Sequence, residues 1–220
     1  EKIWSQNISS NYKDHTYVSN FTKKYINKGG KVLEAGCGLG QHVFSLHKND
    51  FNVTGVDYAT NTIKFLKDKF PKLDIQHGNV ENLKKFNSST FDFYWSMGLI
   101  EHFFYGFEKL ILEAVRVTKN GGYLGFTFPT INPIRRAKIK LGYYKKLTKE
   151  DIDIENFYQY AFNDKKIIKE LKSYNLEFIE KKYLDAFKSF KDDIDFLKLP
   201  LQKIYSSNNV YSKIIKKIIN

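Results

Sequence analysis

The chain has almost no cysteine and no long apolar run, and both absences restrict the classes of protein to which it can belong. Its single cysteine, Cys37, has no second cysteine with which to form an internal disulfide, which fits a reducing cytoplasm. No stretch approaches the roughly 18 consecutive apolar residues of a membrane-spanning helix. No secretory signal, internal repeat or low-complexity linker is visible. We therefore expect a cytoplasmic single-domain protein, whose 42% hydrophobic and 16% aromatic residues suffice for a full core.

The charge is basic and unevenly distributed along the chain. The net charge is +12, of which residues 1–130 contribute 16 basic minus 12 acidic side chains, or +4, and residues 131–220 contribute 20 minus 12, or +8. A basic half is typical of contact with nucleic acid, an anionic membrane surface or an acidic substrate. Arginine is rare beside lysine, asparagine, isoleucine and tyrosine, so the base composition of a genome is an alternative source of this excess.

The strongest motif lies at residues 32–42. Apolar residues that suit a buried strand run into glycines at alternate positions, and an apolar helical pattern follows. The glycines are Gly36, Gly38 and Gly40. Without Cβ atoms, this backbone can bend sharply and approach a ligand closely. The next predicted strand, 51–56, leads into Asp57, whose carboxylate can accept hydrogen bonds from both hydroxyls of a ribose.

The spacing of these glycines restricts the class of ligand that the turn can bind. A dinucleotide-binding turn would place its third glycine at position 41, which is Gln41 here, so the pyrophosphate-binding form does not match. The pattern from Glu34 to Gly40, with Asp57, resembles the class I S-adenosylmethionine-dependent methyltransferases. The resemblance implies that Glu34 helps to hold the methionine amino group, that the glycine turn passes under the methionine and ribose, and that Asp57 holds the ribose.

The resemblance continues in the loop after the third predicted strand, 73–76. Asn79 stands where the family carries an Asp or Asn near the adenine amino group, and the apolar Val80 would lie against the ring. Aspartate is the commoner residue, and Asn79 is alternatively a simple turn residue. The remaining cofactor contacts that we expect are Tyr58, Ser96 and Met97.

A second motif follows the fourth predicted strand, 91–96. The sequence Gly98-Leu-Ile-Glu-His-Phe103 resembles a segment that many small-molecule methyltransferases carry at the tip of this strand. In an open α/β sheet this tip lies where ligands bind, which would place His102 near the acceptor. A neutral imidazole there can take a proton from an acceptor oxygen or nitrogen. The alternative is a structural histidine that bonds loop backbone, while Glu101 orients the loop or caps the next helix.

The rest of the chain predicts further helices and strands. We expect helices at 11–27, 59–69, 107–119 and 163–173, and strands at 123–128 and 176–184. A closing strand beyond these is not evident. Residues 197–220 form a basic amphipathic extension that would pack on the enzyme or a second subunit, or contact a membrane peripherally.

The acceptor site has weaker sequence signals. Residues 130–160 resemble a small cap over this site, and Arg135 and Arg136 would recognise a carboxylate or phosphate unless they are simply solvated. Tyr12, Tyr17 and Tyr158 are also candidate acceptor contacts, with core packing as the alternative.

These signals together predict a three-layer, mostly parallel α/β fold of the class I methyltransferase type. It would convert S-adenosylmethionine to S-adenosylhomocysteine while methylating an oxygen or nitrogen of a small molecule, anionic or sugar-like. We assign no metal ligands, and expect a monomer or homodimer. The Asn/Asp-Pro-Pro-aromatic segment of base methylation is absent, which argues against a nucleic-acid acceptor. A lipid or quinone acceptor at a membrane, an RNA acceptor, and a non-catalytic S-adenosylmethionine-binding module remain as alternatives.

Overall fold

The computed structural model describes residues 16–143 and 157–184, together with the single residues 193, 199, 202, 206 and 207. The chain divides into two compact units. The first contains the described residues 16–129 and 157–162, and the second contains those at 130–143 and from 163 onward.

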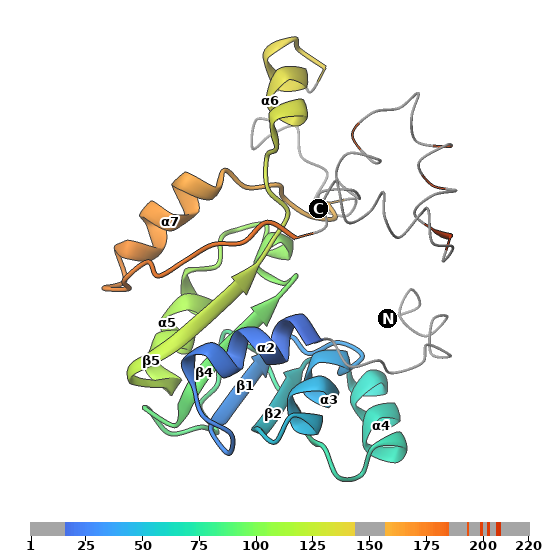
Figure 1. Ribbon diagram of the computed structural model, residues 1–220, viewed down its shortest axis with the longest axis vertical. Coiled ribbons are helices and arrows are strands. Elements are labelled where there is room, and N and C mark those ends of the chain that lie inside the picture. The colour runs from blue at the N-terminus through green and yellow to red at the C-terminus, as the bar shows by residue number, and fades with distance from the viewer. Residues whose placement is uncertain are drawn as a thin grey trace. The chain divides into compact units, whose positions relative to one another are not determined.

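The first unit is built on a five-stranded parallel sheet (Figure 1). Its strands are β1 (Lys31–Ala35), β2 (Asn52–Asp57), β3 (Asp74–His77), β4 (Phe91–Met97) and β5 (Thr118–Thr127). They pair in the order β3-β2-β1-β4-β5, and every pairing is parallel. Because the order reverses between β1 and β4, the carboxyl ends of these two strands form the switch point where open α/β sheets bind ligands. The predicted α/β fold is confirmed.

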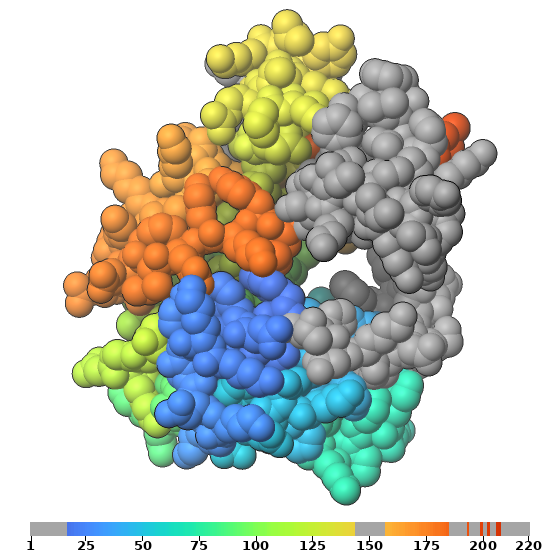
Figure 2. All heavy atoms as spheres, viewed as in Figure 1, coloured from blue at the N-terminus to red at the C-terminus, as the bar shows by residue number. Residues whose placement is uncertain are grey.

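Helices cover both faces of this sheet. Figure 1 shows α2 (Thr16–Tyr25) and α3 (Gln41–Lys48) on the face toward the viewer, and α5 (Glu108–Val117) on the opposite face. A core cluster joins alternate strand residues to α2, α3 and α4 (Thr60–Lys69). It includes Val18, Val32, Val43, Leu46, Val53, Ile63, Leu66, Ile75, Phe93 and Trp95. In Figure 2 the atoms of these helices, coloured blue to teal, lie side by side on that face.

The largest core residue, Trp95, joins three elements. Its indole Nε1 donates to Thr22 Oγ1 of α2 at 3.0 Å, and the Thr22 hydroxyl donates in turn to the Val18 carbonyl at 2.8 Å. Both Trp95 and Thr22 are buried. On the β5 side, a Cβ added to Gly125 would lie 2.3 Å from Trp95 Cζ3, so the strand can pass the ring only without a side chain there. The hydrogen bond therefore fixes α2 on the sheet without leaving a buried donor unpaired.

The helix before β5 ends earlier than the sequence predicts. We expected the helix to reach residue 119 and the strand to begin at 123, but α5 ends at Val117 and β5 begins at Thr118. Thr118 pairs with Phe91 in parallel register, and its hydroxyl donates to the Ala114 carbonyl at 2.7 Å. Pairing with β4 therefore overrides the glycines at 121 and 122 as the helix stop, and the register shifts between Phe91 and Phe93 accommodate the extra residues.

The second unit contains two described helices, α6 (Pro133–Lys140) and α7 (Asp164–Lys172). The predicted helix at 163–173 is confirmed, with Asn163 as its N-cap accepting from the Lys165 and Lys166 amides. None of the helices in the described ranges is both long and apolar enough to cross a membrane.

The predicted strand at 176–184 is wrong, because no residue in that range is in a strand. Most of its apolar side chains are exposed, with Ile179 at 55% of its free area, so apolar content alone did not give a sheet partner. The segment is held to the start of α7 instead, since Lys181 Nζ and Tyr183 OH both donate to the Asp164 carboxylate at 2.5 and 2.7 Å.

We predict that Thr22→Val lowers the free energy of unfolding by about 1–3 kcal/mol, because it keeps the side-chain volume and leaves the Trp95 indole N–H buried without an acceptor. Thr22→Ser is the matched control, since it keeps the hydroxyl and should lose less. Urea denaturation followed by tryptophan fluorescence measures both. Equal stability of Thr22→Val and the parent chain would show that this hydrogen bond does not hold α2.

Candidate cofactor and methyl-acceptor site

The turn between β1 and α3 has the left-handed backbone that its glycines allow. Gly36, Gly38 and Gly40 have φ of 79°, 47° and 69°. A Cβ on Gly36 would lie 2.7 Å from Leu99 Cδ2, so that glycine lets the β4 loop pack against the turn. Around Gly38, by contrast, no atom lies within 4 Å of an added Cβ. Gly38 therefore faces open space at the switch point, as a turn that approaches a ligand requires.

Asp57 ties the end of β2 to this turn. Its Oδ2 accepts from the Gly38 amide at 2.7 Å, and its Oδ1 accepts from the Ala59 amide at 2.9 Å. The Asp57 side chain is nearly buried. Each carboxylate oxygen has a second lone-pair site, so two further donors, such as a pair of vicinal hydroxyls, can still bind.

Glu34 is the second acid of the site and is completely buried. Burial raises its pKa well above the usual range, the Val43 backbone amide opposes this effect, and the charge of Asp57 adds to the rise. Its Oε2 has no hydrogen-bond partner among the described residues. A buried carboxylate oxygen without a donor is costly, so this atom is suited to a cationic or N–H-bearing ligand.

The loop after β3 presents the two predicted adenine contacts differently. Asn79 is exposed and its Oδ1 accepts from the Glu81 amide at 2.9 Å, while Val80 is buried. Tyr58 is also exposed, and its carbonyl bonds His77 Nε2 at 3.0 Å, which connects the ends of β2 and β3.

The end of β4 and the loop that follows it contain two further buried polar atoms without partners in the described part of the chain. These are Ser96 Oγ and Glu101 Oε2. Burial raises the pKa of Glu101, and the neighbouring His102 opposes this rise. Gly98, with φ of 64°, turns the chain here, and its amide is held by Thr127 of β5. Together with Glu34, these atoms give the switch point three buried acceptors that no described side chain satisfies.

His102 follows in the short 3-10 helix η1 (Ile100–His102) and is exposed. Its Nδ1 lies 2.7 Å from the Tyr158 carbonyl oxygen, and the two rings meet edge to face with centroids 5.3 Å apart. A carbonyl oxygen only accepts, so Nδ1 carries the proton in this bond. The neutral ring then has its lone pair on Nε2, which has no partner among the described residues.

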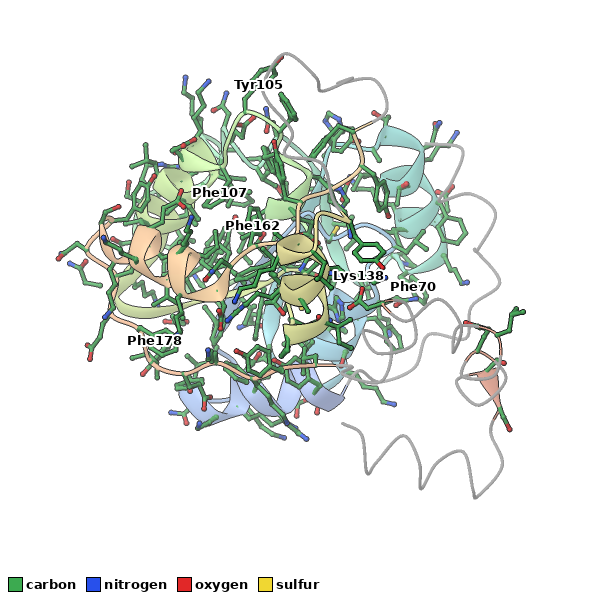
Figure 3. All side chains as sticks on the ribbon, turned by 90° about the horizontal axis from the view of Figure 1, so that it is seen from above. Phe70, Tyr105, Phe107, Lys138, Phe162 and Phe178 are labelled. Carbon is green, nitrogen blue, oxygen red and sulfur yellow. The ribbon has the colours of Figure 1, made fainter. Side chains whose placement is uncertain are left out.

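The sequence marks Tyr158 as a candidate acceptor contact, but it does not reveal that the backbone of this segment bonds His102 and Glu101. The Tyr160 amide donates to the Glu101 carbonyl at 2.9 Å, the Tyr160 hydroxyl to the Phe104 carbonyl at 3.2 Å, and the Phe162 amide to the Pro129 carbonyl at 2.8 Å. Ring contacts reinforce this docking, and Figure 3 shows Phe162 beside Phe107, at a centroid distance of 5.9 Å. The aromatic run from 157 to 162 was the available signal, but its backbone contacts have no sequence signature.

The weaker candidate residues lie elsewhere. Tyr17 packs against the core cluster through α2, and Tyr12 lies outside the described residues, as does most of 197–220. Arg135 belongs to the second unit, where its Nε donates to the buried Asp193 carboxylate at 2.8 Å. Arg136 is in the same unit and is exposed.

Residues 33–126 match the family model described as a methyltransferase domain. This region is a class I S-adenosylmethionine-dependent methyltransferase domain. Its match ends one residue before the end of β5, so it contains both acids, the glycine turn and the β4 tip.

Relatives of the methyltransferase domain agree with this assignment, and a solved structure shares its fold. Phthiotriol/phenolphthiotriol dimycocerosates methyltransferase 1 of Mycobacterium ulcerans is 32% identical over 120 residues, 52% of this chain and 44% of that protein. The ubiquinone biosynthesis O-methyltransferase of Paracidovorax citrulli is 30% identical over 116 residues, 50% and 47% of the two chains. A crystal structure of an S-adenosylmethionine-dependent methyltransferase from Methanosarcina mazei shares the fold, with a TM-score of 0.59, 20% identity, and coverage of 75% and 89%. The chain spans about half the length, or somewhat less, of the curated relatives it matches.

The methyltransferase domain implies S-adenosylmethionine as its cofactor, and the residues present fit this molecule. Glu34 offers an unsatisfied buried acceptor for an ammonium group, Asp57 has capacity for two hydroxyls, and Gly38 leaves room beside the turn. Each fit follows from an atom of this chain, and the cofactor contacts of Glu34, Gly36, Gly38, Gly40 and Asp57 stay predictions.

We predict that Gly38→Ala lowers the affinity for S-adenosylhomocysteine at least about tenfold, because its methyl group would occupy the open space beside the turn. Left-handed backbone at an alanine costs roughly 1–2 kcal/mol of stability. Gly121→Ala is the matched control, since Gly121 also has positive φ and open space but lies at the opposite end of β5. Calorimetric titration measures the loss of affinity, and melting curves measure the loss of stability. Equal losses of affinity in the two variants would exclude a specific role for Gly38.

We predict that Glu34→Gln raises the melting temperature of the cofactor-free protein at pH 7.5 and weakens cofactor binding. Burial raises the pKa of Glu34 in the folded state, so the unfolded state loses this proton first as the pH rises. The buried carboxyl therefore destabilises the fold only above its usual pKa of 4.5, and this loss of stability grows with pH. The gain of the variant should therefore vanish near pH 4, and each kcal/mol corresponds to about 2–4 °C at this chain length.

Glu177→Gln, at an exposed glutamate of the second unit, is the control for Glu34→Gln and should leave the melting temperature unchanged at both pH values. A melting temperature that falls in Glu34→Gln at pH 7.5 would show that a donor outside the described residues already satisfies the Glu34 carboxylate.

Proposed function

We propose that this protein is an S-adenosylmethionine-dependent methyltransferase that methylates an oxygen or nitrogen of a small molecule, with His102 as the general base. The observation that carries the proposal is the hydrogen bond from His102 Nδ1 to the Tyr158 carbonyl, which leaves the Nε2 lone pair available beyond the tip of β4. This position adjoins the switch point, where Glu34 and Asp57 offer acceptors for the cofactor.

We propose the following cofactor contacts. The Glu34 carboxylate holds the methionine ammonium group, Asp57 accepts hydrogen bonds from the two ribose hydroxyls, and the Gly36–Gly40 turn passes beneath both. Asn79 and Val80 contact the adenine, with Tyr58 at its exposed side. Ser96 and Met97, at the end of β4, border the reacting end. The unsatisfied Ser96 Oγ and the half-buried Met97 support this assignment.

The chemistry then divides between the cofactor and the chain. Bound S-adenosylmethionine supplies an electrophilic methyl group, so the protein has to align the acceptor, exclude water and remove one proton. His102 Nε2 accepts the proton of the acceptor hydroxyl or amine as that atom becomes positive. The Tyr158 carbonyl stabilises the resulting imidazolium through the Nδ1–H bond. Because His102 is exposed, it returns the proton to solvent.

The relatives support an oxygen acceptor on a largely apolar molecule as the best-favoured class. One is named for ubiquinone biosynthesis and O-methylation, and another for phthiotriol and phenolphthiotriol dimycocerosates. The expectation of an anionic acceptor depended on Arg135 and Arg136, and the ion pair of Arg135 with Asp193 weakens it. We therefore favour a lipid or quinone precursor as the acceptor over a sugar-like metabolite or RNA.

We predict that His102→Ala lowers the rate of methyl transfer about a hundredfold or more, as expected for loss of a general base, while its affinity for S-adenosylhomocysteine stays near that of the parent chain. Transfer of labelled methyl groups is measured against hydroxylated aromatic compounds, amines, extracted lipids and tRNA. His47→Ala is the control, because His47 is exposed at the end of α3, away from the switch point.

Three results would contradict this proposal in different ways. Unchanged turnover in His102→Ala would make that histidine structural. Efficient methylation of tRNA and of no other compound tested would show that the acceptor is RNA and not a small molecule. Tight cofactor binding without transfer to any of these acceptors would support the non-catalytic alternative.

A further inference from the structure

The helix α6 is stable for reasons that do not include a core. None of its residues is buried. Its N-cap is Asn132, whose side chain accepts from the Arg135 amide at 2.8 Å, and Pro133 occupies the first turn. Helices of this length seldom form without a packed face, so the capping has to compensate.

The C-terminal end of α6 is closed by a Schellman motif. Gly142 has φ of 75° and its amide donates to the Ile139 carbonyl, while the Tyr143 amide donates to the Lys138 carbonyl. These are the two bonds of that motif, and they satisfy carbonyls that would otherwise be open. The motif also fixes Leu141 and Tyr143 directly after the helix.

One ion pair attaches α6 to its own unit. The Arg135 guanidinium donates to Asp193, which is buried, and Asn132 Nδ2 donates to the same carboxylate. The Arg135 side of the helix is therefore oriented toward the unit. The side chains of Ile134 and Lys138 on this side are half-buried as well.

The opposite face combines positive charge with exposed apolar side chains. Arg136, Ile139 and Lys140 follow the spacing i, i+3 and i+4 within the helix, so they lie along one face, and all three are exposed, as is Tyr143 just after the helix. Ile139 is 46% exposed and Tyr143 is 74% exposed, and the adjacent Leu141 is 73% exposed. The segment 133–143 has no acidic residue. Large apolar side chains at these exposures have a cost in water that a partner would remove.

We propose that the α6 surface, defined as Arg136, Ile139, Lys140, Leu141 and Tyr143, docks on an anionic lipid bilayer. Cations that attract anionic headgroups, beside apolar side chains that enter the acyl boundary, are the combination that interfacial helices use. Nucleic acid would pair with the cations but would not bury Ile139 and Leu141. This proposal concerns binding and does not depend on the methyltransferase activity.

The test is sedimentation of the full chain, without cofactor, with vesicles of equal parts phosphatidylglycerol and phosphatidylcholine. We expect binding that weakens with salt and is nearly absent on pure phosphatidylcholine. The double variant Arg136→Glu with Lys140→Glu should bind more than about tenfold more weakly. The double variant Leu141→Ser with Tyr143→Ser should also bind more weakly, and its loss should persist at high salt.

The matched control is Lys165→Glu with Lys169→Glu on α7, which reverses two exposed charges at the same spacing in the same unit. It should sediment like the parent chain, and melting curves confirm that all variants fold. Equal losses in the α6 and α7 variants would reduce the effect to net charge and overturn the proposal. Vesicle binding unchanged in both α6 variants, or tight binding of tRNA that the α6 charge reversal removes without any vesicle binding, would overturn it too.

Discussion

The two backbone hydrogen bonds that Asp57 accepts hold the binding edge of the sheet in one piece. They join the end of β2 to the glycine turn that follows β1, and they use one lone-pair site on each oxygen. The amides of Gly36 and Cys37 add to this junction by donating to the Val56 carbonyl. A carboxylate that is fixed in this way has lost its rotational freedom before any ligand arrives, so the entropic cost of binding is lower.

The proposed base depends on a distant part of the chain. Tyr158 lies 56 positions after His102, and only its carbonyl oxygen takes part. The segment around it is held by two backbone bonds to the carbonyls of Glu101 and Pro129, by the Tyr160 hydroxyl on the Phe104 carbonyl, and by aromatic contacts. The residues that form the cofactor edge thus lie before the end of β5, whereas the tautomer of His102 is set by a segment that comes later in the chain.

Much of the fold could be predicted because many of its determinants are local. The glycines at alternate positions, the acid after an apolar strand and the Asn163 cap each specify a backbone geometry by residue type. The strand at 176–184 failed because a strand needs a partner, which apolar content does not reveal. The end of α5 was misplaced because pairing of Thr118 with Phe91 competes with the glycine stop.

In the candidate site, too, the features set by local sequence could be predicted, and those set by distant contacts could not. Glu34, Gly38 and Asp57 lie at the switch point as expected, although their contacts with a cofactor remain predictions. The charge of Arg135 was visible, but its partner Asp193 is 58 positions away and only the fold brings them together. The role of Tyr158 was not predictable from its side chain, because the group that bonds His102 is a backbone carbonyl that every residue carries.

The unsatisfied buried oxygens of Glu34, Ser96 and Glu101 have a consequence for the protein in the cell. Each is a polar group removed from water without a described partner, so the empty protein is less stable than its packing alone would make it. A molecule that binds only the folded state and supplies donors to these atoms shifts the folding equilibrium by mass action. Under the proposed function that molecule is the methyl donor, so starvation for methionine would increase the unfolded fraction, and proteases would then lower the abundance of the protein.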